Sequence, residues 1–137
     1  MLDADGPGLQ HVWRDACEKR RDWSGALTSS LAPTGSRALL LCRVHVNGGR
    51  FQLLGASAGA PIEFVNLCRQ FGADVWMGGT QQRHVAGVGR VAWSAVTTGD
   101  ASVVLFGLYS EAADLPGLSH VALLSEKCVT EREAGRG

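Results

Sequence analysis

The sequence predicts an α/β (α+β) protein, a three-layer sandwich built on a five-stranded antiparallel sheet. Residues 38–46 and 50–57 alternate as two strands around the turn residues of segment 47–49, which is typical of a hairpin. Residues 101–110 are apolar in both alternating registers, which is typical of a strand covered on both faces. Stretches with helical spacing come before, between and after these strands. We therefore expect the order helix, strand, strand, helix, strand, strand, strand, helix.

Length and composition fit one domain spanning residues 1–137, because 45% of the residues are hydrophobic and 19% are charged. Thirteen Lys and Arg residues balance thirteen Asp and Glu residues. Since this balance leaves no net field to hold a polyanion, we expect no nucleic-acid partner. The longest apolar run, residues 38–42, is far shorter than the roughly 20 residues that span a bilayer, so we expect no direct membrane insertion.

The four cysteines, Cys17, Cys42, Cys68 and Cys128, lie far apart within apolar stretches. The first residues lack the charged and apolar regions of a secretory signal, so we expect reduced, buried thiols in a cytoplasmic protein. Cys42 and His45 are three residues apart on a strand and point to opposite faces, which disfavours a shared metal or nucleophilic site. We expect no metal and no cofactor.

Signals of catalysis are weak in this sequence. Ser94 and Ser110 do not lie in a strained nucleophile turn, and the histidines are scattered along the chain. The glycine-rich segments 78–80 and 87–90 lack the residues of a phosphate-binding loop and are better interpreted as turns or a bulge. We therefore expect no enzymatic activity, while a catalytic pair assembled from distant residues stays an open alternative.

The ends of the chain and its first third are interpreted from composition. Residues 9–23 carry apolar side chains at helical spacing and are predicted to form an amphipathic helix. Residues 24–37 are rich in Ser, Gly, Pro and Thr and are predicted to be a linker between this helix and the sheet. Residues 1–8 and 130–137 are predicted to be flexible tails.

Alternation assigns faces to the strands. In the first strand, Leu40, Cys42 and Val44 share one face, and Arg43 and His45 share the other. Residues 84–96 are predicted to form one or two strands, broken near 87–90. The last strand carries one set of apolar side chains on each of its two faces. A helix follows this strand from about residue 114. The two sets of the last strand are Val103, Leu105 and Tyr109 against Val104, Phe106 and Leu108.

A helix is predicted from Pro61 to about Val75, with apolar residues on most of its circumference. Only a narrow polar face is left, so the apolar surface of this helix must be covered on two sides. The sheet supplies one cover, and a second protein copy is the predicted source of the other. Trp76 and Met77, which follow the helix, are interpreted either as a plug of the core or as an interface anchor.

Residues 89–118, GRVAWSAVTTGDASVVLFGLYSEAADLPGL, resemble the last strands and the entry to the last helix of the roadblock family. Residues 38–59, ALLLCRVHVNGGRFQLLGASAG, are similar to the first hairpin of that family. The resemblance extends over about residues 36–128. It implies a non-enzymatic dimerisation and scaffolding module that binds or regulates a small GTPase or a multi-subunit complex.

On this interpretation the chain forms a homodimer or a heterodimer with a similar domain, with a small GTPase or scaffold protein as a further partner. The middle helix and the strand after it would form the interface. The predicted interface residues are Phe64, Cys68, Phe71, Val75, Trp76, Met77 and Val85.

A GAF-like sensor domain is the alternative function. Such a domain needs a pocket between sheet and helices with a few convergent polar groups. The candidates for these groups are Arg43, His45 and Arg90.

Overall fold

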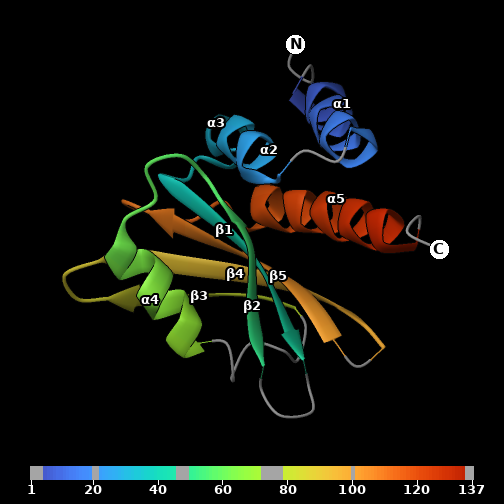
Figure 1. The fold of residues 1–137 in the computed structure, drawn as a ribbon. Helices are drawn as coiled ribbons and strands as arrows, with labels where there is room; N and C mark the ends of the chain where they lie inside the picture. Colours follow the sequence, from blue (N-terminus) through green and yellow to red (C-terminus); the bar gives the residue numbers. More distant parts are fainter. Residues whose placement is uncertain (1–4, 20–21, 46–49, 72–78, 100, 135–137) are drawn as a thin grey trace.

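The fold is a five-stranded antiparallel sheet with helices on both faces, as the sequence predicts (Figure 1). The computed structural model describes residues 5–19, 22–45, 50–71, 79–99 and 101–134. The strand order is β2-β1-β5-β4-β3, which places the last strand in the centre of the sheet. None of the helices in these ranges combines the length and apolar character that a membrane span requires.

The strands are β1 (Ala38–His45), β2 (Phe51–Ala56), β3 (Gly79–Val85), β4 (Gly89–Thr98) and β5 (Ala101–Tyr109). The helices are α1 (Asp5–Glu18), α2 (Ser24–Ser29), α3 (Leu31–Thr34), α4 (Ile62–Phe71) and α5 (Leu115–Ala134).

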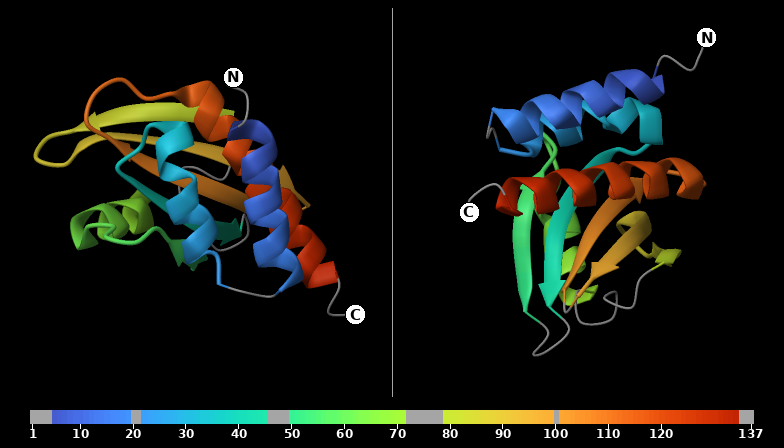
Figure 2. Two further views of the ribbon diagram at one scale, coloured as in Figure 1. Left: turned by 90° about the horizontal axis from the view of Figure 1, so that it is seen from above. Right: turned by 90° about the vertical axis from the view of Figure 1, so that its right-hand side faces the viewer.

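One face of the sheet, called here the α5 face, is covered by α5 and α2, and α1 lies outside these two helices (Figure 2). Apolar side chains of the helices and of every second strand position form a continuous core here, which is the arrangement that stabilises a sheet against helices. Its buried members are Leu9, Trp13, Ala16, Trp23, Ala26, Leu27, Leu39, Leu41, Ala92, Val103, Leu105, Tyr109, Leu118, Val121, Ala122, Cys128 and Val129.

The opposite face, called here the α4 face, has its own core. Phe64 and Cys68 of α4 are fully buried there among the alternate positions of the strands. The strand residues of this core are Ala38, Leu40, Cys42, Val44, Val91, Trp93, Ala95, Val104, Phe106 and Leu108.

The alternation predicted for the last strand is confirmed. Val103, Leu105 and Tyr109 belong to the core on the α5 face, and Val104, Phe106 and Leu108 belong to the core on the α4 face. Strand β5 is paired on both sides, to β1 and to β4. A strand in this position is covered above and below by helices and laterally by strands, which explains why it carries no charged side chain.

The predicted linker is the largest error of the sequence-based interpretation. Residues 24–37 contain the helices α2 and α3, and Leu27 is fully buried. The hydroxyl groups of Thr28 and Ser30 donate to the carbonyl oxygens of Ser24 and Ala26, each at 2.8 Å. These hydroxyls are satisfied within the helix, and burial of Leu27 and Ala26 stabilises it, so composition alone misled the prediction.

Helix ends also differ from expectation. Helix α1 ends at Glu18, before the predicted end at residue 23, and α5 continues to Ala134. Residues 5–8 and 130–134 are therefore helical, where flexible tails were predicted. Strand β3 begins at Gly79, within the segment 78–80 that was interpreted as a turn or a bulge.

Candidate ligand-binding groove

The end of the β1–β2 hairpin gathers polar side chains on the α5 face of the sheet. The alternation of β1 places Arg43 and His45 on this face. Across the hairpin, Gln52 is the register partner of Arg43, and the backbone N–H of His45 donates to the carbonyl of Arg50 at 3.0 Å. Directly opposed residues of an antiparallel pair share a face, so the four side chains form one group.

These residues line an open groove of about 510 Å³. We call it the Arg43 groove, and its lining residues are Arg43, His45, Arg50, Phe51 and Gln52.

A second cavity of about 200 Å³ adjoins the Arg43 groove, with which it shares Arg43 and Gln52. We call it the Trp23 cavity. It extends from the hairpin to the last turns of α5, and its lining residues are Trp23, Arg43, Gln52, Leu54, Val129, Arg132 and Glu133.

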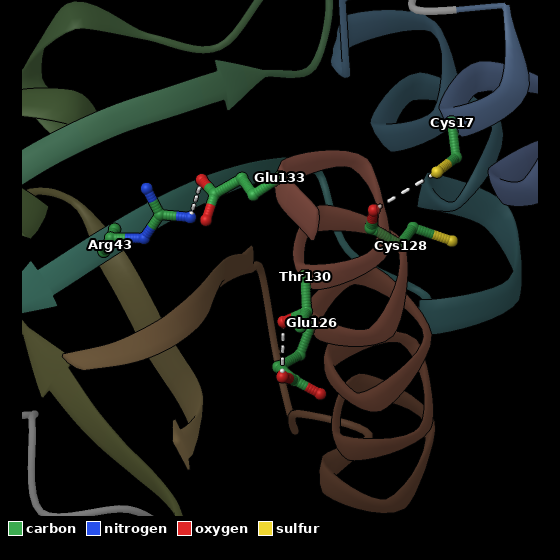
Figure 3. A network of polar contacts seen from close by, with 6 residues as sticks. All are labelled: Cys17, Arg43, Glu126, Cys128, Thr130 and Glu133. Atoms are coloured by element: carbon green, nitrogen blue, oxygen red, sulfur yellow. Dashed lines mark hydrogen bonds and ion pairs between the residues drawn. The ribbon is translucent and has the colours of Figure 1, made fainter. Parts of the chain in front are cut away.

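Glu133 in the last turn of α5 forms an ion pair with Arg43, as Figure 3 shows. The Arg43 side chain is 15% exposed, whereas that of Glu133 is 50% exposed. The neighbouring Arg132 donates a hydrogen bond to the carbonyl of Ala16 in α1, and its guanidinium lies 3.8 Å from the ring centre of Trp23. The end of α5 is therefore attached to β1 by one side chain and to α1 and Trp23 by the next.

The Arg43 groove has an excess of positive charge. Arg43 and Arg50 carry guanidinium groups, His45 adds an imidazole, and the carboxylate of Glu133 pairs with Arg43. Within the described ranges, the side chains of Arg50 and His45 have no ion pair. Guanidinium groups bind carboxylate and phosphate through two parallel hydrogen bonds, so this arrangement favours an anionic group.

A different groove, of about 400 Å³, lies between α1 and α5 and has balanced charge. Arg14 and Lys127 are matched there by Glu18 and Glu131. A surface whose charges already compensate one another gives little selectivity for a charged ligand, so we place the candidate site at the hairpin instead.

The buried cysteines are unsuited to nucleophilic chemistry. Burial raises the pKa of Cys42 and of Cys68 far above the ordinary thiol value, although the nearby Arg69 lowers that of Cys42. Burial also raises the pKa of Cys128 to about 11, and the neighbouring Cys17 adds to this effect. Because the thiolate is the reactive form, these thiols are inert at neutral pH. All four cysteines are free, and burial of the last three is confirmed.

Metal binding finds no support in the part of the chain that the structure describes. No group of three His, Cys, Asp or Glu side chains there has the proximity to hold an ion. Cys42 is buried on the α4 face and His45 lies on the α5 face, as their spacing predicts.

The predicted polar groups are divided between two places. Arg43 and His45 meet in the groove, whereas Arg90 lies on β4 and donates to Gln82 of β3 at 3.1 Å. Arg50 and Gln52 were missed, although the register of a hairpin turning at 47–49 would have indicated them. Glu133 gives no such signal, because it is 90 residues from Arg43 in the chain.

The predicted interface residues fall mostly in the core or outside the described residues. Phe64 and Cys68 are fully buried against the sheet, and Val85 is half-buried against the same core. Phe71 is the last residue of α4, and its side chain is outside the described part. Val75, Trp76 and Met77 also lie outside the described residues. A dimer through this region stays a prediction.

Comparison with known proteins identifies the fold. No protein-family model and no curated protein matches the chain. A phycoerythrobilin-bound GAF domain from a cyanobacterial phytochrome is similar, with a TM-score of 0.63, 9% identity, and coverage of 96% of this chain and 98% of that chain.

Two further solved structures are similar over almost their whole length. The VqsR LBD domain from Pseudomonas aeruginosa has a TM-score of 0.59 and 9% identity, with 90% of this chain and 95% of that chain covered. The N-acylhomoserine lactone dependent LuxR family factor CepR2 from Burkholderia cenocepacia has a TM-score of 0.57 and 12% identity, with 96% and 95% covered. At these identities the similarity establishes the fold alone.

Proposed function

We propose that this chain is a GAF-like sensor domain that binds a small molecule in the Arg43 groove. The observation that carries the proposal is the convergence of Arg43, His45, Arg50 and Gln52 in one groove. Support comes from the fold, which the chain shares with a phycoerythrobilin-bound GAF domain and with a factor that depends on N-acylhomoserine lactone.

The dimensions and the lining of the groove suit such a ligand. A volume of about 510 Å³ lies within the range of roughly 300–1,000 Å³ that small-molecule sites occupy. Arg43 and Gln52 offer hydrogen-bond donors, and the adjoining Trp23 cavity offers the apolar side chains of Leu54 and Val129. A few fixed polar groups beside an apolar surface are what orients a small ligand.

The proposal includes a non-enzymatic role and a cytoplasmic location. The free thiols of Cys17, Cys42, Cys68 and Cys128 favour a reducing compartment. The inert state of the buried thiols agrees with a binding role, in which the domain changes its conformation or stability with ligand instead of turning over a substrate.

The test is a thermal-shift screen of the full chain against small molecules that include acids, bases and neutral compounds. We expect a bound compound to raise Tm, and the replacement Arg50→Ala to weaken its binding at least about fivefold, the scale of a lost charged hydrogen bond. The matched control is Arg37→Ala, which removes an exposed arginine just before β1 and outside the groove. Equal weakening by both replacements, or a screen without a hit, would contradict the proposal.

The roadblock-like scaffold that binds a small GTPase stays a prediction from the sequence. Its interface residues Phe64 and Cys68 are occupied in the core of this chain. We therefore do not place the function there, and the experiment that separates the two functions is given below at the scale of the whole molecule.

A further inference from the structure

We infer that the ligand of the Arg43 groove carries an oxyanion, a carboxylate or a phosphate, and that it binds by displacing Glu133 from Arg43. This inference rests on the proposed sensor function and adds the ligand class and the way in which binding is transmitted. It is argued from the charges of the groove, the unequal burial of the two ion-pair partners and the contacts of the last turn of α5.

Charge defines the ligand class. The chain as a whole has a formal net charge of zero, so the two arginines of the groove are a local excess of positive charge. Arg50 is exposed and has no carboxylate partner among the described residues. Together with Arg43 it presents two guanidinium groups to one groove, and a single oxyanion can accept hydrogen bonds from both.

Glu133 occupies the position on Arg43 that an incoming oxyanion would take. Arg43 is mostly buried, at 15% exposure, and needs an anionic partner to offset its lost hydration. Glu133 is 50% exposed and can return to water at small cost. When a ligand oxyanion replaces Glu133, the guanidinium of Arg43 therefore keeps an anionic partner. The group that returns to water is Glu133, which is the more exposed of the two.

The exchange changes how α5 is held. Glu133 attaches the last turn of this helix to β1 (Figure 3). Arg132 attaches the same turn to α1 through the carbonyl of Ala16 and to the ring of Trp23. When an oxyanion takes Arg43, the contact with β1 is lost and the contacts of Arg132 remain. The last turn of α5, beyond the buried Val129, is then held through α1 and Trp23 and no longer through Glu133.

The experiment is a titration of the full chain with inorganic phosphate and, separately, with acetate, followed by two-dimensional NMR at constant ionic strength set with sodium chloride. In the wild-type protein we expect the Arg43 side-chain signal and the backbone amides of residues 132–134 to shift together. In Glu133→Gln we expect phosphate to bind about two- to fivefold more tightly, because the carboxylate that competes with phosphate for Arg43 is gone and the ion pair it made was partly exposed. The amide shifts of residues 132–134 should then be small.

The matched control is Glu131→Gln, which removes the same charge from an exposed position of the same helix turn, on the groove between α1 and α5. An equal gain in phosphate affinity in both variants would mean that the loss of one negative charge, wherever it lies, explains the gain. That result overturns the displacement of Glu133 and leaves the sensor function intact. Binding of a neutral or cationic screen compound, with neither phosphate nor acetate bound, overturns the oxyanion class alone. Failure of every compound to bind removes the sensor function together with this inference.

Discussion

Tyr109, at the end of the central strand, illustrates how burial alone changes the chemistry of a residue. Its side chain is almost fully buried. Within the described residues its hydroxyl has no hydrogen-bond partner in good geometry, although Thr34 lies beside it. Burial, helped by the negative charge of Asp114, raises the pKa of Tyr109 from 10.0 to about 12, while Thr34 lowers it slightly. The folded protein therefore favours the neutral phenol.

This shift predicts a loss of stability at alkaline pH. Below pH 10 both states keep the proton, so the contribution of Tyr109 is fully present. Between pH 10 and about 12 the unfolded state loses the proton first, so the contribution of Tyr109 to the free energy of unfolding falls by roughly 3 kcal/mol. The replacement Tyr109→Phe should reduce this fall and change stability at pH 7 by less than about 1 kcal/mol.

The measurement is chemical denaturation of both proteins at several pH values. Residual pH dependence in Tyr109→Phe is expected, because the raised pKa of Cys128 acts in the same direction between about pH 9 and 11. The chain has a single tyrosine, so its tyrosinate absorbance gives the pKa directly. A measured pKa near 10 in the folded protein would contradict the prediction.

At the scale of elements, the packing of α1 on the segment after α2 depends on one buried hydrogen bond. The indole Nε1 of Trp13 donates to the hydroxyl of Ser30 at 3.1 Å, and that hydroxyl donates to the carbonyl of Ala26 at 2.8 Å. Trp13 also stacks on Trp23, with ring centres 5.6 Å apart. The aromatic pair supplies apolar area, and the serine satisfies the one polar atom that this area would otherwise bury unpaired.

The replacement Ser30→Ala should lower the free energy of unfolding by about 1–3 kcal/mol, since it leaves the buried indole N–H of Trp13 without a partner. Ser29→Ala is the control, because Ser29, the last residue of α2 and the chain neighbour of Ser30, is exposed and its replacement should cost less than about 0.5 kcal/mol. Urea denaturation of the two variants measures the difference. Equal losses would show that the bond between Trp13 and Ser30 does not hold these elements together.

At the scale of the whole molecule, α4 separates the two functions considered for this chain. Phe64 is fully buried, whereas Ile62 on the same helix is 63% exposed. The replacement Phe64→Glu should unfold the domain, because it places an unpaired charge in the core on the α4 face. Ile62→Glu should leave the fold and its Tm nearly unchanged.

Thermal unfolding and the solution mass by light scattering check this expectation. A Phe64→Glu protein that stays folded with the wild-type Tm, and that has half the wild-type mass, would contradict the core assignment. That outcome would support the dimeric scaffold predicted from the sequence. Unfolding of Phe64→Glu, with no change of Tm or mass in Ile62→Glu, would agree with a helix that packs in the core of its own chain.

Local patterns predicted the parts of the fold in which one face is fully apolar. Alternation along residues 101–109 identified a strand buried on both faces, and the turn at 47–49 identified the hairpin. The same alternation placed Arg43 and His45 on a shared face. Residues 24–37 were misread, because Ser and Thr are compatible with loops and with helices, and the choice depends on the burial of Leu27 and Ala26 by distant elements.

The amino-acid pattern is sufficient for the class of the fold, since periodicity assigns helices, strands and the faces of each strand. Tertiary structure alone decided which distant residues join Arg43 at the candidate site. Arg43 and Gln52 come from the hairpin, while Glu133 and Arg132 come from the last turn of α5, and they meet only because this helix brings its last turn to β1. No local propensity encodes that meeting, because contacts between distant segments depend on how whole elements pack against one another.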